Sequence, residues 1–462
     1  MTRHAIVTAL TVNARLRGAR ALNLIQSSHE EAYPLEQWQQ TLQSILSELD
    51  DGQYEQALKH LAEVESLAAD HPDRLAQLAE LYFDLGHQGA AERMAEKALE
   101  LEEEMTVALL IKGEIAVERE NWDEAVDYLE RANRAEPNQP DVLVALADCY
   151  REMGILEVAI HYLEQLVEQE PLSPHYLHAL GLTQLESGEP RAAINSLMTA
   201  HEMDRQDTDI LTTLAQALVE VGQWEESIRY WEQALRLNPD DTDAALSKAV
   251  LLYKIGESDE ALDLLRQLKE REPENTAVLK QLGEVELALG RTRDAKNTWK
   301  ALHRLDPYQP DAYLSLGRIA LKEQNWSEAL DYFRRALEYG DDRDDVWIGM
   351  AEAYRGMGEW SEALDCYEQM INHSDEASPP AGIYREMARC YMELEALDAA
   401  VECLEKELQM TDDADLHNEL ADAYWQSGRR ADACACWKHS LQLDPNQWEV
   451  ADLYERNCGD DE

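Results

Sequence analysis

Small and apolar residues recur along this chain with a fixed period of about 34 residues. The position that marks the period holds a small residue throughout, with slips only at its end: Ala57, Ala91, Ala125, Ala159, Ala193, Ser227, Ala261, Ala295, Ala329, Ala363, Ala400 and Ala433. A fixed period of this length predicts a solenoid, in which each repeat buries its apolar face only against its neighbours.

Within each repeat, apolar residues are spaced by three and four positions, most plainly over residues 311–317, 324–330 and 332–336. This spacing predicts two helices of about a dozen residues, joined at a glycine or a polar pair. Proline closes many repeats, where a helix interior would not tolerate it. These prolines are Pro137, Pro171, Pro239, Pro273, Pro307 and Pro445.

The period, the Leu-Gly pair of the first helix, the Trp or Tyr before the small residue and the closing proline resemble the tetratricopeptide repeat family. The resemblance covers residues 38–447 as twelve units, of which ten have the full period, one carries an insertion at 378–380 and the next is one residue short. It implies an all-α fold, a right-handed α-solenoid superhelix of about twelve helical hairpins. In this family the aromatic fills a gap beside the small residue, so four tryptophans are expected in the core: Trp122, Trp224, Trp326 and Trp360.

Both ends of the repeat region are expected to act as caps. Residues 1–37 form an N-terminal tail, cap or targeting segment, and the first repeat carries Ser44-Ile45 in place of Leu-Gly. Residues 448–462 are expected to form a short capping helix over 448–458 and an acidic tail. A terminal repeat needs a polar outer face because half of its apolar stripe has no neighbour.

The chain is strongly acidic, with 94 Asp and Glu against 41 Lys and Arg, a formal net charge of −53 and a pI near 4.4. Nucleic acid is therefore not expected as a partner, because duplex binding depends on Lys and Arg neutralising phosphates. No stretch approaches the roughly 18 consecutive apolar residues that would span a bilayer. An apolar run at residues 5–12 leaves a short secretion signal open as an alternative to a cytoplasmic location.

The seven cysteines are odd in number and do not suggest a disulfide framework, so reduced thiols in a cytoplasm are expected. Six of them lie in the last quarter of the chain, which raises a metal or redox alternative for Cys434, Cys436 and Cys458. Cys434 and Cys436 are two apart on a helix and point to different faces, which favours simple packing.

No nucleophile, phosphate-binding or metalloprotease motif is present, so the sequence predicts a non-enzyme without a cofactor. His175 and His178 have a spacing that can hold a metal, but no third ligand converges on them in the sequence. Paired carboxylates are too common in this chain to identify an acid or a base.

In the family, the first helices of stacked repeats line a concave surface that holds a peptide or a partner helix. On the face opposite the apolar stripe, five successive first helices carry carboxylates spaced by one period: Asp84, Glu118, Glu152, Glu186 and Glu220. Glu80, Glu114 and Asp148 lie one turn before the first three. We call these eight residues the acidic ladder, and we expect its negative potential to attract a Lys- or Arg-bearing segment, with a solvated surface as the alternative.

Further along, the same face carries a basic cluster: Arg318, Lys322, Arg355, Arg385 and Arg389. Guanidinium groups grip carboxylates, so the cluster either binds an acidic segment or a C-terminal carboxylate, or pairs internally with Glu352 and Glu393. The Lys-x-x-x-Asn clamp of chaperone-binding relatives is missing.

The function expected from these features is a non-catalytic scaffold or adaptor that binds partner peptides or helices in the groove. The alternative is a substrate-presenting or regulatory arm of an enzyme complex, such as glycosyltransferase or envelope-assembly machinery.

Overall fold

The structure is a computed structural model and describes residues 32–373 and 379–458. The apolar run near the N-terminus, Ser378 of the insertion and the acidic residues 460–462 lie outside this described part. The described residues form two compact units, the first ending at Ala244 and the second beginning at Ala245.

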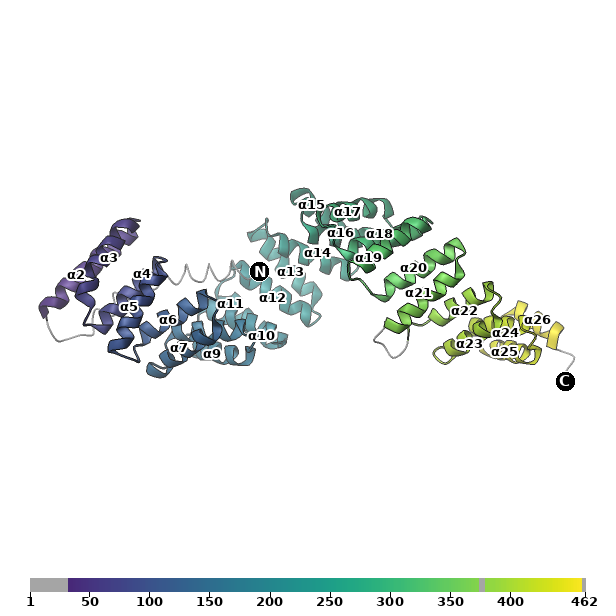
Figure 1. The fold of residues 1–462 in the computed structure, drawn as a ribbon, viewed down its shortest axis with the longest axis horizontal. Coiled ribbons are helices and arrows are strands. Elements are labelled where there is room, and N and C mark those ends of the chain that lie inside the picture. The colour runs from purple at the N-terminus through teal and green to yellow at the C-terminus, as the bar shows by residue number, and fades with distance from the viewer. Residues whose placement is uncertain (1–31, 374–378, 459–462) are drawn as a thin grey trace. The chain divides into compact units, whose positions relative to one another are not determined.

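Every regular element in the described part of the chain is an α-helix (Figure 1). The first unit contains α2 (Ala32–Asp50), α3 (Tyr54–Ala68), α4 (Pro72–Asp84), α5 (Gln88–Leu101), α6 (Thr106–Glu118), α7 (Trp122–Ala135), α8 (Pro140–Glu152), α9 (Leu156–Gln169), α10 (Pro174–Glu186), α11 (Pro190–Met203), α12 (Thr208–Glu220) and α13 (Trp224–Leu237). Helix α14 (Thr242–Lys254) contains the boundary between the units.

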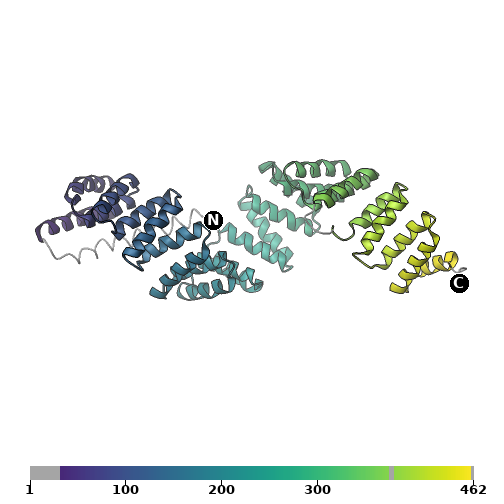
Figure 2. The ribbon, with the colours of Figure 1, turned by 60° about the horizontal axis from the view of Figure 1, so that its bottom comes forward.

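The second unit continues with α15 (Ser258–Arg271), α16 (Thr276–Ala288), α17 (Thr292–Leu305), α18 (Pro310–Lys322), α19 (Trp326–Glu338), α20 (Asp344–Met357), α21 (Trp360–His373), α22 (Ile383–Glu393), α23 (Leu397–Leu408), α24 (Ala414–Gln426), α25 (Arg430–Leu443) and α26 (Trp448–Cys458). The expected hairpins are present, since each even-numbered helix from α2 to α12 and from α16 to α24 packs against the odd-numbered helix that follows it (Figure 2).

Neighbouring hairpins make more contact between their first helices than between their second helices. The first helix of a hairpin contacts the first helix of the next, as α4 does α6, α6 does α8, α10 does α12 and α18 does α20. Among the described residues, no two second helices of neighbouring hairpins make comparable contact. First helices therefore line the inner side of the stack within each unit, as the repeat pattern predicts.

The turn inside each hairpin uses a residue in the left-handed region of backbone conformation. Glycine holds this position in most repeats, as at Gly86 and Gly154, where φ is 73° and 75°. Glu120 and Gln324 adopt the same conformation at φ 57° and 59° in repeats that lack the glycine. The sequence pattern of a glycine or a polar pair at this turn thus reflects one backbone geometry.

The small residues that mark the period are fully buried between the helices of a hairpin. Ser227, the one exception to alanine, is also fully buried, and its hydroxyl donates to the carbonyl oxygen of Ala215 over 2.7 Å. Glycines of the first helices meet large side chains: a Cβ on Gly317 would lie 2.6 Å from Phe333, and one on Gly349 would lie 2.4 Å from the same ring. Phe333 is therefore held between the first helices of two successive hairpins.

The expectation that four tryptophans form the core is wrong for Trp224, which is 39% exposed. Trp122, Trp326 and Trp360 are only partly buried. Each of the four is the first residue of a second helix, α7, α13, α19 and α21. At that position Trp326 meets Gly356, near the end of the first helix of the next hairpin, α20, and its ring is only partly covered.

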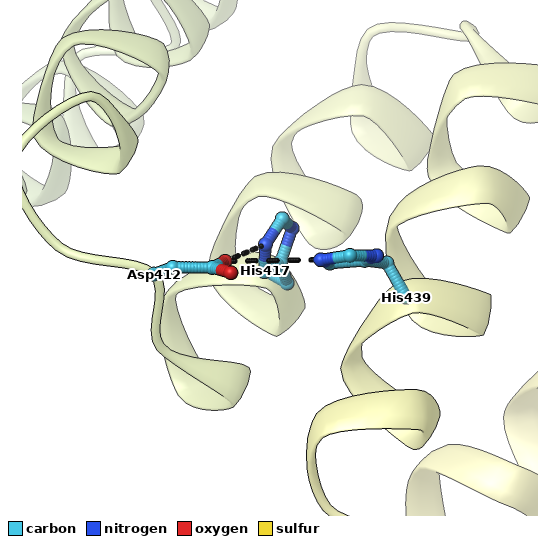
Figure 3. A group of neighbouring side chains, drawn as sticks. All are labelled: Asp412, His417 and His439. Atoms are coloured by element: carbon cyan, nitrogen blue, oxygen red, sulfur yellow. Dashed lines mark hydrogen bonds and ion pairs between the residues drawn. The ribbon is translucent and has the colours of Figure 1, made fainter.

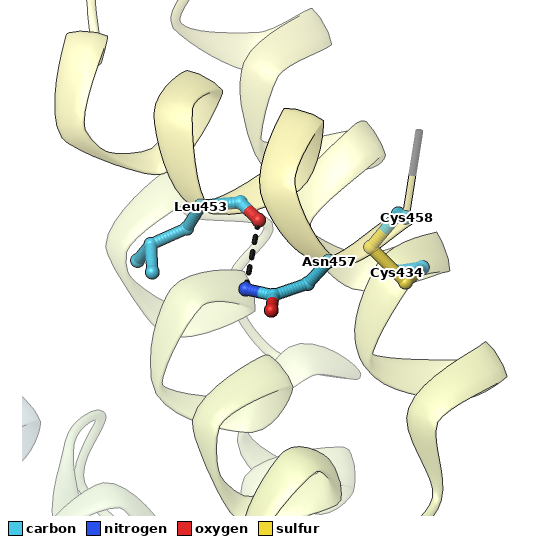
Figure 4. The surroundings of a disulfide bond; sticks show 4 residues. All are labelled: Cys434, Leu453, Asn457 and Cys458. Atoms are coloured by element: carbon cyan, nitrogen blue, oxygen red, sulfur yellow. Dashed lines mark hydrogen bonds between the residues drawn. A yellow bond between two sulfur atoms is a disulfide. The ribbon is translucent and has the colours of Figure 1, made fainter. Parts of the chain in front are cut away.

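The prediction of reduced thiols is wrong at the end of the chain, where Cys434 and Cys458 form a disulfide (Figure 4). Their Cα atoms are 5.8 Å apart, within the range that a disulfide spans. The bond joins α25 to α26, a helix with no buried residue of its own. The expected packing role holds for Cys366 and Cys403, which are buried, and burial raises the pKa of the Cys366 thiol to about 12.

The close approach at Phe333 predicts the effect of adding a single methyl group. Gly349→Ala would place a Cβ against a fully buried ring that cannot move away, so we expect the free energy of unfolding to fall by about 1–3 kcal/mol. Urea unfolding followed by circular dichroism measures the change. Gly89→Ala is the matched control, because no atom lies within 4 Å of its added Cβ, and a gain of about 0.5–1 kcal/mol is expected there. Equal midpoints for the two variants would contradict the close-packing account.

Candidate functional site

The five main positions of the acidic ladder share one structural place. Each is the last residue of a first helix, in α4, α6, α8, α10 and α12 respectively. All five are exposed. The carbonyl end of a helix carries partial negative charge, so a carboxylate there adds to the local negative potential and is unfavourable for the helix. The ladder therefore forms a strongly negative row along the helix ends of the first unit.

The other three ladder residues, Glu80, Glu114 and Asp148, occupy the ninth position of their helices. Asp148 is exposed, yet the surrounding protein desolvates its carboxyl and raises the pKa to about 6. The nearby Arg151 lowers this pKa and Glu152 raises it. Desolvation also raises the pKa of Glu284 and Asp422, which hold the same ninth position in the second unit. Desolvation thus acts on these three carboxylates at the ninth position.

Several ladder carboxylates have neighbours of their own. Arg151 lies 3.4 Å from Glu152 and 3.8 Å from Glu186, measured between guanidinium nitrogen and carboxylate oxygen, so one cation bridges two steps. Glu118 accepts a hydrogen bond from the Gln88 amide, but desolvation outweighs this bond and raises its pKa. Glu80, Asp84 and Glu114 are also engaged in interactions.

The arginines of the basic cluster are ion-paired within the second unit. Arg385 donates two hydrogen bonds to Glu419, over 2.8 and 3.0 Å. Arg389 lies 2.7 Å from Glu419 and 2.7 Å from Glu386, and Glu386 also pairs with Arg355. The partners are therefore Glu386 and Glu419 rather than the expected Glu352 and Glu393.

The two remaining basic residues lie in α18. Arg318 pairs with Asp345 at 2.6 Å. Lys322, the last residue of the helix, is exposed and has no ion pair in the part of the chain that the structure describes. Across the cluster, ion pairs connect first helices of adjacent hairpins, so the arginines link one hairpin to the next.

Metal-binding geometry occurs at a place that the sequence did not indicate. The His178 ring nitrogen contacts the Thr213 hydroxyl at 3.0 Å, and within the described ranges no third ligand joins it and His175. Asp412, His417 and His439 instead bring three ligand atoms within 4.8 Å of one another. The register held a signal, because His417 occupies the fourth position of a first helix, which is leucine in six other repeats.

None of the helices in the described part combines the length and apolar character that a membrane span requires. No curated protein matches the chain. Solved structures with similarity include a tetratricopeptide repeat protein from Parabacteroides merdae, with 17% identity, 54% of this chain and 97% of that chain covered, and a TM-score of 0.41. YrrB, a TPR protein with an unusual peptide-binding site, is 20% identical over 41% of this chain and 97% of that chain, with a TM-score of 0.38. A chain of the APC/C hetero-tetramer Cut9-Hcn1 is 15% identical over 91% of this chain and 96% of that chain, with a TM-score of 0.39.

Family models described as tetratricopeptide repeat match residues 76–140, 212–276 and 280–345, residues 116–182 and 320–381, and residues 414–447. These ranges together cover well over half of the chain, and they coincide with the paired helices described above. The chain belongs to the tetratricopeptide repeat family.

Proposed function

We propose that this protein is a non-catalytic scaffold whose first unit binds a basic segment of a partner protein along the acidic ladder. The repeat family supports a protein-interaction scaffold in general terms. The observation that carries the specific proposal is the row of carboxylates at successive helix ends, together with the raised pKa of Asp148.

The carboxylates of the ladder lower the stability of the folded protein when no partner is bound. Each step places a negative charge at the negative end of a helix, and five steps follow one another in neighbouring hairpins. A Lys or Arg side chain bound at a step offsets both the repulsion between carboxylates and the interaction with the helix end. Bound cations would therefore add to the compensation that Arg151 already supplies at Glu152 and Glu186.

The spacing of the ladder suggests how the partner is built. Adjacent first helices lie about 10 Å apart when they pack. A chain in the extended polyproline II conformation advances about 3.1 Å per residue with three residues per turn, so every third side chain lies on one face and falls opposite a new step. The preferred partner is accordingly an extended segment with Lys or Arg at every third position.

Neutralising the ladder should weaken this binding. We expect Glu118→Gln, Glu152→Gln and Glu186→Gln together to lower the affinity for a labelled peptide with Lys at every third position by roughly tenfold at low salt. Fluorescence anisotropy measures the affinity, and its dependence on salt should flatten because fewer charges take part.

The matched control removes the same number of charges from second helices of the same unit, through Glu100→Gln, Glu164→Gln and Glu202→Gln. These glutamates are exposed on α5, α9 and α11. If both triple variants lose the same affinity, the effect belongs to net charge and the ladder is not the site. A peptide of equal composition with its lysines clustered tests the spacing, and tighter binding of the clustered peptide would contradict the three-residue match.

Binding should also depend on pH through Asp148. A bound cation stabilises the ionised carboxylate and so lowers its pKa from about 6. As the pH falls from 7.5 to 5.5, the free protein takes up a proton that binding must release, and the affinity should fall by several fold. Asp148→Asn should bind more weakly at pH 7.5 and show a smaller change with pH. An unchanged pH profile in this variant would remove Asp148 from the site.

We infer that the four arginines of the basic cluster stabilise the stack of hairpins and do not serve as a partner site. Arg385 and Arg389 share Glu419, whose side chain is 27% exposed. Burial raises the pKa of Glu419, but the hydrogen bonds from Arg385 and Arg389 outweigh it and hold the pKa below its ordinary value. An external carboxylate would have to displace these bonds before it could bind.

Removing the shared charge should destabilise the second unit. We expect Glu419→Gln to lower the free energy of unfolding by about 1–3 kcal/mol at pH 7. Because the folded-state pKa is lowered, the stabilisation is present above the pKa of the unfolded chain and is lost as the pH falls through the folded value. The difference from the unmodified protein should therefore shrink between pH 5 and pH 3 in urea unfolding. Glu393→Gln, at an exposed site without an ion pair in the described residues, should change stability by less than about 0.5 kcal/mol. A difference independent of pH would contradict the ion-pair account.

A further inference from the structure

Three side chains with metal-binding atoms converge near the end of the second unit (Figure 3). Asp412 lies in the connection between α23 and α24, His417 in the first turn of α24, and His439 on α25. The Asp412 Oδ1 atom is 2.8 Å from Nε2 of His417 and 3.8 Å from Nε2 of His439. The two rings are in edge contact, with centroids 4.5 Å apart. Three separate segments thus direct one ligand atom each to a common point.

His417 stands at a position where the repeat normally places an apolar residue. It is the fourth residue of its first helix, and six other first helices have leucine there: Leu75, Leu109, Leu143, Leu177, Leu211 and Leu279. The His417 side chain is only 13% exposed, and its Nδ1 atom is buried without a hydrogen-bond partner. A histidine in this place is unfavourable for packing alone, because a buried polar atom is left unsatisfied.

The donor set has a defined chemical preference. Two imidazoles and one carboxylate suit Zn²⁺ and the neighbouring divalent transition metals, whereas Mg²⁺ and Ca²⁺ prefer oxygen ligands. Bonds of about 2.0–2.1 Å in a tetrahedral site place ligand atoms roughly 3.3 Å apart. The two distances to Asp412 lie on either side of this value, so small side-chain movements would complete the geometry.

We propose that Asp412, His417 and His439 bind a divalent transition-metal ion of the Zn²⁺ class, with a fourth position left for water or for a side chain of a bound partner. An aspartate carboxylate is ionised at neutral pH, as a metal ligand must be. The site lies on the connection and helices of the last hairpin, apart from the acidic ladder of the first unit. Its test is therefore independent of the ladder proposal.

The experiment titrates the full chain with Zn²⁺ by calorimetry, in excess Mg²⁺ to occupy surface carboxylates and without reductant, so that Cys434 and Cys458 stay in their disulfide. We expect one Zn²⁺ per chain with a dissociation constant at or below the micromolar range. His417→Leu installs the residue that six other repeats use, so the fold should be retained, and the affinity should fall at least tenfold. His175→Gln removes an exposed histidine elsewhere and should bind as the unmodified protein does.

Two further readouts separate a metal site from a His–Asp ion pair. Co²⁺ in place of Zn²⁺ should give visible absorption typical of tetrahedral coordination in the unmodified protein and lose it in His439→Gln. Zn²⁺ should raise the unfolding temperature of the unmodified protein and leave that of His417→Leu unchanged. Absence of saturable Zn²⁺ binding, or equal affinity in His417→Leu, would overturn the proposal and leave the three side chains as an ion pair.

Discussion

The structure depends on the inability of a single helical hairpin to bury its own apolar stripe. Phe333 shows the constraint at one residue, since its ring is enclosed by Gly317 of its own hairpin and Gly349 of the next. Neither hairpin alone provides both walls. Because each repeat must complete its neighbour in this way, the buried alanines and the left-handed turn recur at fixed places, and helices of the same kind are brought side by side.

The same constraint organises the charges. Once packing fixes the register, any side chain that recurs at the same position of each first helix is placed in a row along neighbouring first helices. The first unit uses this to align carboxylates at helix ends, as at Glu118 and Glu152. The second unit uses it to pair opposite charges between adjacent first helices, as Arg385 of one hairpin pairs with Glu419 of the next. A row of like charges and a set of internal ion pairs are thus two outcomes of one geometry.

The parts of the structure that follow the repeat were predictable from the sequence, and the parts that depart from it were not. Apolar spacing and turn residues predicted the helices and their pairing, because both are local. The exposure of Trp224 was missed because the repeat pattern does not show how far a side chain at the start of a second helix is covered.

The disulfide and the Asp412–His417–His439 group near the end of the chain were not predicted, because each joins a repeat helix to a segment outside the regular repeat pattern. The Cys434–Cys458 disulfide joins a repeat helix to a helix outside the repeats, so no spacing within the repeats could reveal it. Asp412 lies in the connection of a shortened repeat, and its meeting with His417 and His439 depends on how that connection is placed. The ladder and the basic cluster could be located from the register, but the partners of the arginines required the side chains themselves.

The even steps of the ladder have a consequence for recognition. A row of equivalent positions cannot by itself distinguish one alignment of the proposed partner from another that is shifted by a single step. The degeneracy is broken where Arg151 occupies the interval between Glu152 and Glu186. Because Arg151 makes this interval differ from the others, it would favour one alignment of the proposed partner over the alignments shifted by a step.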